Sequence, residues 1–209
     1  MKPEIWDPYY VKILDYFGFS READEQSAKI LSGLLPHDDL LLLINAIEGA
    51  DIIVAGNSPS LAKDITKTDF TGSCIIAADA AARKLNTAGI RPDVIFSDLD
   101  GLDDDFLAMN EKGTILVIHA HGDNIPLVKS WLPKVKGPVI GTTQSTPLDN
   151  VYNFGGFSDG DRAVFAAHEL GGRTVKLIGF DLDDRSVDPV KHGKLMIARN
   201  LLHLLGHDI

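Results

Sequence analysis

The stretch Pro92-Asp93-Val94-Ile95-Phe96-Ser97-Asp98-Leu99-Asp100-Gly101 joins an apolar run to an acidic turn. Its apolar residues follow one another without polar alternation, so the predicted strand Asp93–Ser97 has both faces buried. Strands of this kind build mainly parallel sheets that helices cover on both faces. Ligands of such sheets bind beyond the carboxyl ends of the strands, so the residues after Ser97 are the first candidates for a site.

Six further segments read in the same way and alternate with helical patterns. The other predicted strands are Asp51–Ala55, Ser73–Ala77, Thr114–His119, Pro138–Gly141, Val151–Phe154 and Thr174–Gly179. The predicted helices are Pro59–Ile65, Asp79–Ala88, Asp104–Lys112, Ile125–Trp131, Gly160–Leu170 and Pro189–Leu205. Residues 1–50 show amphipathic helical patterns and no buried-strand run. We therefore predict an α/β fold with a mainly parallel, Rossmann-like sheet over residues 51–209, preceded by an N-terminal helical segment over residues 1–50.

The composition limits the partners and the location of the protein. Lys and Arg number 20 against 30 Asp and Glu, so the formal net charge of −10 argues against nucleic acid and anionic membranes as partners. The longest strongly apolar run, Leu40–Ile44, is far shorter than a membrane span, and the single Cys74 excludes an internal disulfide framework. We expect a cytoplasmic protein. The run Leu40–Ile44 is expected in the core, with a homodimer interface as the alternative.

The acidic residues are mostly aspartates, and Asp98 with Asp100 is the strongest candidate for a metal site. In an extended chain, side chains two residues apart leave on the same face, so both carboxylates would point together. A divalent cation relieves the repulsion between two such carboxylates, and Gly101 lets a ligand approach closely. The alternative is an ordinary turn in which one of the two acids caps the next helix. The run 103–105, three further aspartates, is best explained by such capping.

A second cluster follows the predicted strand that ends at His119. If the chain stays extended, His119, His121 and Asp123 share one face. This cluster indicates a polar substrate site or a magnesium site. A catalytic zinc held by the two histidines is one alternative, although no other predicted strand end carries a histidine. Structural histidines with satisfied hydrogen bonds are the other alternative.

Two glycine-containing turns before predicted helices are suited to phosphate. Residues 155–162, Gly-Gly-Phe-Ser-Asp-Gly-Asp-Arg, place glycines at a helix amino end, where backbone amides bind anions, and add Arg162 as a fixed cation. Ser158 and Asp161 also match a capping box, so capping alone is the alternative. Residues 56–61, Gly-Asn-Ser-Pro-Ser-Leu, can offer backbone amides in the same way. Residues 142–144, Thr-Thr-Gln, offer neutral hydrogen bonds that can orient a heterocycle.

Many carboxylates, two anion-binding helix starts and few basic residues together indicate a ligand whose phosphates reach the protein through Mg²⁺. Phosphoryl transfer fits this composition, because its catalysis relies on positioning and on charge neutralisation by metal ions. The chain contains neither a Walker loop nor the glycine pattern of dinucleotide-binding sheets.

In their order along the chain, these motifs resemble the archaeal 6-hydroxymethyl-7,8-dihydropterin diphosphokinase family. The motifs are Gly56-Asn57-Ser58-Pro59-Ser60-Leu61, Ala78-Asp79-Ala80, residues 92–101, 119–124, 141–144 and 155–162, and the match runs from about Gly56 to Asp181. The resemblance implies a fold similar to thiamine diphosphokinases, with residues 51–209 as the α/β diphosphokinase domain. It also implies Mg²⁺-dependent transfer of diphosphate from ATP to the reduced pterin, with AMP as the other product, in folate or methanopterin biosynthesis. Ser97 and Ser158 stand where the family pattern has threonine, and Gly179-Phe180-Asp181-Leu182 varies its Gly-Met-Asp.

With this resemblance, the candidate residues receive roles as hypotheses. The predicted Mg²⁺ ligands are Asp98 and Asp100, with Asp79, Asp123 or Asp161 as additional acids. The predicted nucleotide site is Gly56, Asn57, Ser58, Ser60, Asp79, Gly156 and Ser158, and the predicted pterin site is Asn124, Thr142 and Gln144. Arg162, with Lys191 and Lys194 as further cations, would stabilise developing charge, and His121 or one of the acids would accept the substrate proton. Two alternatives stay open: a nucleotide-binding module without turnover, and a diphosphokinase for another hydroxymethyl heterocycle such as thiamine.

Overall fold

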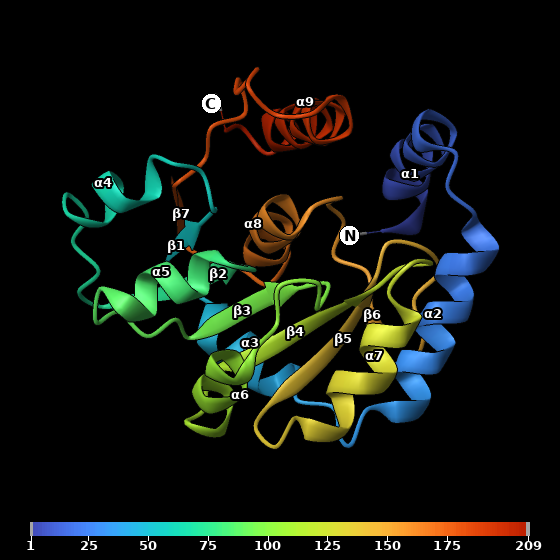
Figure 1. Cartoon of the computed structure of the whole chain (residues 1–209), viewed down its shortest axis with the longest axis horizontal. Coiled ribbons are helices and arrows are strands. Elements are labelled where there is room, and N and C mark those ends of the chain that lie inside the picture. The colour runs from blue at the N-terminus through green and yellow to red at the C-terminus, as the bar shows by residue number, and fades with distance from the viewer. Residues whose placement is uncertain (1, 208–209) are drawn as a thin grey trace.

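The computed structural model describes residues 2–207 and has one seven-stranded sheet at its centre (Figure 1). The strands are β1 Asp51–Ala55, β2 Ser73–Ala78, β3 Val94–Ser97, β4 Ile115–Ala120, β5 Val139–Thr143, β6 Val151–Tyr152 and β7 Thr174–Ile178. They lie in the order β6-β5-β4-β3-β2-β1-β7, and each pair of neighbours is parallel. The predicted α/β fold with a parallel sheet is confirmed.

The strands begin and end within one residue of their predicted bounds, except at the carboxyl ends of β5 and β6, which each differ by two residues. Strand β5 extends to Thr143, since Thr142 and Thr143 pair with the last two residues of β4. Strand β6 ends at Tyr152, before the predicted end, since its pairing with β5 stops there. Thr142 therefore lies inside the sheet and not in the loop after it.

Alternate residues of each inner strand face two separate helix layers. In β1, Ile53 and Ala55 belong to one apolar cluster, and Ile52 and Val54 belong to another. This alternation explains the unbroken apolar runs, because both faces of the sheet are covered. The first layer contains α2 Arg21–Leu34, α4 Leu61–Ile65, α5 Ala81–Thr87, α6 Asp104–Glu111, α7 Ile125–Trp131 and the 3-10 helix η1 Leu132–Lys134. The second layer contains α3 Leu40–Ile47, α8 Asp159–Glu169 and α9 Pro189–Leu204.

Helix α1, Pro3–Phe17, packs on the outside of the second layer. Its buried residues Trp6, Tyr10 and Ile13 form a third apolar cluster with side chains of α8 and α9. The indole of Trp6 also donates a hydrogen bond of 2.7 Å to the backbone oxygen of Gln144, just after β5. Helix α1 is therefore fixed both to the outer helices and to the carboxyl edge of the sheet (Figure 1).

The predicted N-terminal helical segment contributes to both layers of the fold. Leu31 of α2 is fully buried in the first layer, and Leu43 and Ile47 of α3 are fully buried in the second. The apolar run Leu40–Ile44 is only partly in the core, since Leu41 and Leu42 are 74% and 48% exposed. No helix within residues 2–207 combines the length and apolar character needed to cross a membrane.

Helix α8 crosses the sheet and brings its amino end to the central strands. Strands β6 and β7 lie at opposite edges, so the chain between them passes over the second face, where α8 contacts β1, β2, β3 and β7. The strand order reverses between β1 and β7, and crevices that bind ligands in such sheets lie at this kind of reversal.

Helix α2 lies close to β5 because residue 141 has no side chain. A Cβ atom at Gly141 would lie 2.9 Å from Cδ1 of Leu35 and 3.2 Å from Cδ2 of Leu31. We expect Gly141→Val to lower the free energy of unfolding by about 1–3 kcal/mol through overpacking, measured by urea denaturation. The matched control is Gly33→Ala within α2, where a Cβ meets open space and the change should stabilise the helix by about 0.5–1 kcal/mol. An equal free energy of unfolding for the two variants would contradict the close packing of α2 on Gly141.

Candidate active site

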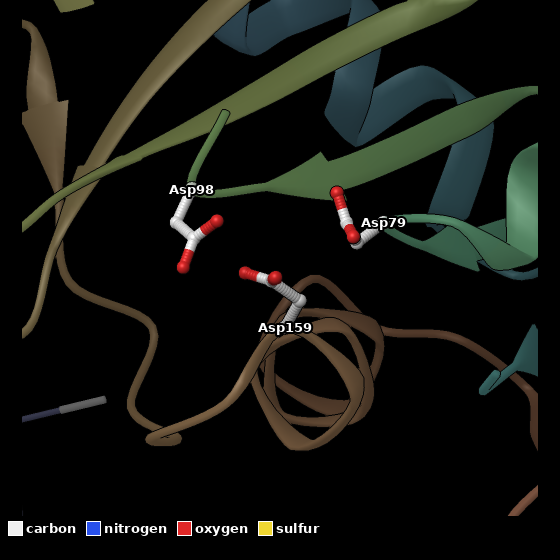
Figure 2. A group of neighbouring side chains, drawn as sticks. All are labelled: Asp79, Asp98 and Asp159. Atoms are coloured by element: carbon white, nitrogen blue, oxygen red, sulfur yellow. The ribbon is translucent and has the colours of Figure 1, made fainter. Parts of the chain in front are cut away.

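Three carboxylates, two from strand ends and one from the start of a helix, lie close together (Figure 2). Asp79 follows β2, Asp98 follows β3, and Asp159 is the first residue of α8. One oxygen from each of the three lies within 4.8 Å of the others, and each side chain is half-buried. Within residues 2–207 this acid triad is the one group of three or more histidine, cysteine or acidic side chains that comes this close. A set of oxygen ligands at this spacing suits a divalent cation such as Mg²⁺.

The turn after β3 differs from the prediction. Leu99 has φ 75°, in the left-handed region, and its side chain is buried in the first layer. The chain therefore turns at Leu99 and does not continue extended, so the prediction that Asp98 and Asp100 leave on the same face was wrong. The amide of Asp100 donates a hydrogen bond of 3.1 Å to Oδ1 of Asp98, while the Asp100 side chain is exposed and lies outside the acid triad.

Asp79 also has an unusual backbone, with φ 44°. Its amide donates a hydrogen bond of 2.7 Å to the oxygen of Phe96, and its Oδ1 accepts one of 3.0 Å from Ser97 Oγ. A Cβ at Gly101 would lie 2.7 Å from Oδ2 of Asp79. The glycine thus makes room for the carboxylate of Asp79, and not for an approaching ligand as the sequence suggested.

The three acids have very different proton affinities. Burial disfavours the charged form of Asp98, but the neighbouring His121, a hydrogen bond from the Asp100 amide and the charge of Arg162 outweigh burial and hold its pKa at about 2. Burial, with the charges of Asp98 and Asp79, raises the pKa of Asp159 to about 7. Burial also raises the pKa of Asp79. A bound cation would remove the repulsion that raises the pKa values of Asp79 and Asp159.

Asp161, a predicted metal ligand, lies elsewhere. It is fully buried, and its carboxylate accepts hydrogen bonds from the amides of Phe157 (2.6 Å) and Ser158 (2.8 Å) and from the Ser158 hydroxyl. The predicted capping box of Ser158 and Asp161 is therefore confirmed. Asp161 fixes the turn before α8, and it is Asp159, two residues earlier, that reaches the triad. The capping pattern was the signal in the sequence that could have separated these two aspartates.

Arg162 offers an incomplete set of hydrogen bonds beside the triad. It is 8% exposed, one amino group donates to the oxygen of Phe157, and its Nε lies 3.9 Å from Oδ1 of Asp159. Its Nε and Nη1 have no hydrogen-bond partner. Gly156, with φ 86°, lies against the Arg162 backbone, where a Cβ would come within 2.6 Å. Buried N–H groups without acceptors are rare, so the guanidinium group of Arg162 is suited to bind an anion.

Two cavities meet at the triad. The first, about 400 Å³, is lined by Asp98, His121, Asp123, Gln144, Arg162 and residues of α2, among others. The second, about 320 Å³, is lined by Gly56, Asn57, Ser58, Asp79, Phe180 and Lys191, among others. Ser158, Asp159 and Lys194 line both. The second cavity lies at the ends of β1 and β7, where the strand order reverses.

Two amides of the turn after β1, which the sequence suggested for an anion, are paired within the fold. The amides of Gly56 and Ser58 donate to the oxygens of Ile178 and Gly179, each at 2.9 Å. The hydroxyl of Ser60, which does not line the cavity, donates to Asp64 at 2.9 Å. These bonds tie β1 to β7, so the turn contributes the shape of the second cavity and the side chains of Asn57 and Ser58.

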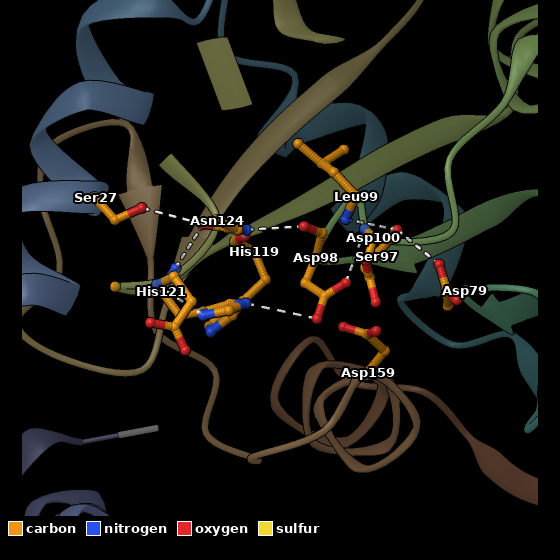
Figure 3. A network of polar contacts seen from close by, with 12 residues as sticks. Ser27, Asp79, Ser97, Asp98, Leu99, Asp100, His119, His121, Asn124 and Asp159 are labelled. Atoms are coloured by element: carbon orange, nitrogen blue, oxygen red, sulfur yellow. Dashed lines mark hydrogen bonds and ion pairs between the residues drawn. The ribbon is translucent and has the colours of Figure 1, made fainter. Parts of the chain in front are cut away.

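The histidine cluster divides into buried and accessible parts (Figure 3). His119 is buried, its Nδ1 lies 3.2 Å from Oγ1 of Thr142, and burial lowers its pKa well below the usual value. His121 lines the first cavity, with Nε2 3.6 Å from Oδ2 of Asp98. Asp123 is exposed after a turn and lines the same cavity. The structure thus brings His121, and not His119, to the acid triad.

Of the three predicted pterin-binding residues, only Gln144 lines a cavity. The amide of Asn124 donates to the backbone oxygens of Asp98 (2.8 Å) and His119 (2.6 Å), and its oxygen accepts from Ser27 Oγ (3.2 Å) and the His121 amide (3.1 Å). All of its hydrogen-bonding groups are therefore used in joining β3, β4 and α2 (Figure 3).

Thr142 is buried within β5, where its hydroxyl donates to the oxygen of Ile118 at 3.1 Å. Sequence reasoning also missed Asp24 of α2, a buried acid that lines the first cavity. In the sequence, Asp24 looks like an ordinary acid in the first turn of a helix.

A side chain at residue 101 should disturb the acid triad without unfolding the protein. We expect Gly101→Ala to displace the Asp79 carboxylate and to weaken Mn²⁺ binding, followed by electron paramagnetic resonance, by about 10–100-fold. The control is Gly33→Ala, which should bind Mn²⁺ like the unchanged protein. Unaltered binding by Gly101→Ala would show that Asp79 is not a ligand.

The metal-free protein should lose stability as the pH rises. The pKa of Asp159 is about 7 in the folded protein, against an ordinary value of 3.8. Between these values the folded form keeps a proton that the unfolded chain has released, so the free energy of unfolding falls with rising pH, by at most about 1.4 kcal/mol per pH unit. In Asp159→Asn this contribution is absent. Urea denaturation in EDTA between these pH values measures the free energy of unfolding of both proteins. The same pH dependence in the unchanged protein and in Asp159→Asn would contradict the raised pKa of Asp159.

The sequence matches a known family and several known proteins. Residues 29–186 match the family model described as 6-hydroxymethylpterin diphosphokinase MptE-like. A protein of Pyrococcus furiosus named 6-hydroxymethyl-7,8-dihydropterin pyrophosphokinase is 43% identical over 100% of this chain and 96% of its own length. Proteins of the same name from Methanothermobacter thermautotrophicus and Methanocaldococcus jannaschii are 37% and 35% identical, each over 98% of this chain and 95% of their own lengths.

A solved structure, the MAf glycosyltransferase of Magnetospirillum magneticum AMB-1, aligns with a TM-score of 0.49 and 19% identity over 82% of this chain and 29% of that longer chain. This likeness carries no functional argument. The family match and the three relatives do, since the family model covers the sheet and the acid triad and the relatives cover nearly the whole chain. The chain belongs to the MptE-like family of 6-hydroxymethylpterin diphosphokinases.

Proposed function

We propose that this protein transfers the diphosphate group of ATP to 6-hydroxymethyl-7,8-dihydropterin, with Mg²⁺ bound by Asp79, Asp98 and Asp159, and releases AMP. The observation that carries this proposal is the meeting of two cavities at one acid triad. A transfer between two substrates needs two binding spaces that share a point of reaction. Membership of the diphosphokinase family and the names of the three relatives support the chemistry.

The second cavity is the proposed site of the nucleotide. It lies at the strand-order reversal, and its lining combines apolar side chains, Phe180 and Leu195 among them, with Lys191 and Lys194. Phe180 packs against both Gly56 and Gly160, where added Cβ atoms would lie 3.1 and 3.0 Å from its ring. An apolar wall suits a nucleobase, and the two lysines suit phosphates.

The first cavity is the proposed site of the hydroxymethyl acceptor. Asp98 and His121 line it, and Asp159 links it to the second cavity. In the proposed reaction the hydroxymethyl oxygen forms a bond to the β-phosphorus of ATP, and the bond from this phosphorus to the bridging oxygen of the α-phosphate breaks. The electron pair leaves with AMP, and the hydroxyl proton passes to His121, which lies beside Asp98.

The remaining roles follow from charge. Bound Mg²⁺ supplies charge neutralisation at the phosphate oxygens. Arg162 directs its free Nε and Nη1 groups to oxygens of the transferred diphosphate, since both are buried beside Asp159 without a partner. The proposed ligand set differs from the predicted one: Asp159 replaces Asp161, while Asp100 and Asp123 lie outside the triad. An all-carboxylate set favours Mg²⁺ over zinc, which prefers nitrogen and sulfur ligands.

One pair of variants in the same helical turn tests the assignment. We expect Asp159→Asn to lower the rate of AMP release from ATP, Mg²⁺ and reduced pterin by about 100-fold or more, with the fold preserved, because a metal ligand is lost. Asp161→Asn should instead lower thermal stability, because its carboxylate holds the turn before α8. Product analysis by chromatography measures AMP and pterin diphosphate directly.

Other products would contradict the proposal in specific ways. ADP in place of AMP would indicate transfer of a single phosphoryl group. Binding of ATP without AMP release, for pterin or thiamine, would support a nucleotide-binding module without turnover. Faster turnover of thiamine than of the pterin would assign the enzyme to another hydroxymethyl heterocycle.

A further inference from the structure

A buried polar pair in the wall of the first cavity has no role in the chemistry above. Asp24 of α2 and Gln144 after β5 are each 3% exposed, and both line the cavity. Gln144 Nε2 donates a hydrogen bond of 2.7 Å to Oδ2 of Asp24. Tyr10 donates to the same oxygen at 2.7 Å, and the amide of Gly122 donates to Oδ1 at 2.8 Å.

These bonds leave the pair with free acceptors. The contact with Asp24 fixes the side-chain amide of Gln144, because a reversed amide would place two oxygens together. Its Oε1 is buried and has no hydrogen-bond partner. Asp24 accepts three hydrogen bonds, and a carboxylate has room for about four. A buried acceptor without a donor is unfavourable, so a ligand that brings N–H groups to this pair would recover free energy on binding.

The rest of the cavity fits a flat ring system. Phe157 lines the cavity and stacks on Phe17 with ring centroids 5.3 Å apart, and Phe17 stacks on Phe19, also in the lining, at 5.2 Å. On another side the chain is tightly packed, since a Cβ at Gly122 would lie 2.7 Å from Cβ of Ala23. A cavity of about 400 Å³ that combines aromatic side chains with polar groups at defined positions can accommodate a bicyclic heterocycle.

We infer that Asp24 and Gln144 bind the donor edge of the acceptor, the neighbouring N3–H and 2-amino groups of a 2-amino-4-oxopyrimidine ring, and so determine specificity for pterins. This inference rests on the proposed function. The hydroxymethyl group of the same ligand would then be directed toward Asp98 and the acid triad. Heterocycles with a carbonyl in place of the 2-amino group present an acceptor to Gln144 Oε1 and are rejected.

The inference gives the N-terminal helices a part in recognition. Asp24 comes from α2, and Tyr10, which fixes the Asp24 carboxylate, comes from α1. Helix α2 thus contributes to the wall of a cavity at the carboxyl edge of the sheet, and α1 supports the Asp24 carboxylate in that wall.

The test compares two ligands that differ at one position. Binding of 6-hydroxymethylpterin and of 6-hydroxymethyllumazine, which carries a 2-oxo group, is measured by fluorescence quenching or calorimetry with Mg²⁺ and a non-hydrolysable ATP analogue. We expect the unchanged protein to prefer the pterin by about 10–100-fold, the range of one or two hydrogen bonds to buried or charged groups. In Gln144→Met and in Asp24→Asn this preference should fall to less than about fivefold.

The matched control is Gln26→Met, an exposed residue of α2 that should keep the full preference. Affinity for the ATP analogue, which we assign to the second cavity, shows that each variant is folded. The comparison of the pterin with the lumazine in the unchanged protein needs no variant. No preference for the pterin there, or an unchanged preference in both Gln144→Met and Asp24→Asn, would overturn the inference while AMP release with reduced pterin still supported the proposed function. Absence of both pterin binding and AMP release would overturn the proposed function itself.

Discussion

The close approach of three carboxylates is the constraint on which the site depends. One oxygen each of Asp79, Asp98 and Asp159 lies within 4.8 Å of the others, and like charges at this distance repel strongly where water is scarce. The chain holds them with unfavourable backbone conformations, φ 44° at Asp79 and 75° at Leu99. Each costs about 1–3 kcal/mol and persists only where the surroundings enforce it. Here the enforcement comes from the buried Leu99 side chain and from the hydrogen bond between the Asp79 amide and Phe96.

The third carboxylate depends on a long-range feature of the fold. Asp159 reaches the ends of β2 and β3 because the chain crosses the whole sheet between β6 and β7 and begins α8 beneath the central strands. The capping box on Asp161 and the close packing of Gly156 on Arg162 fix that starting point. The same short turn therefore positions an acid of the triad and a buried cation, which explains why its sequence is so rich in small and charged residues.

Much of this architecture could be predicted from the sequence, because strands buried on both faces leave unbroken apolar runs and parallel strands bring their carboxyl ends together. The edge that carries the site, the residues Asp79 and Asp98, and the capping box follow from these local rules. The errors have physical causes. A single residue in the left-handed region, Leu99, turns the chain where we expected it to stay extended from Asp98 to Asp100, and no local sequence pattern predicts this turn. Asn124 and Thr142 look like ligand-binding residues, yet their polar groups are used inside the protein. Asp24 has no local signal, since its neighbours in space lie up to 120 residues away.

The electrostatics of the site support the proposed ligand. The acid triad has three carboxylates and needs positive charge, while Arg162, buried beside it, has two N–H groups without acceptors and needs negative charge. Pairing these groups with one another does not solve both problems, because Nε of Arg162 stays 3.9 Å from Oδ1 of Asp159 and Asp161 is committed to the helix cap. A divalent cation alone would satisfy the acids, and a phosphate alone would satisfy the arginine. A metal-bound polyphosphate would satisfy the acids and the arginine together, because its cation would face the carboxylates and its oxygens would face the guanidinium group. The net charge of −10, which argued against polyanionic partners, is therefore compatible with a small polyanion that arrives with its own cation.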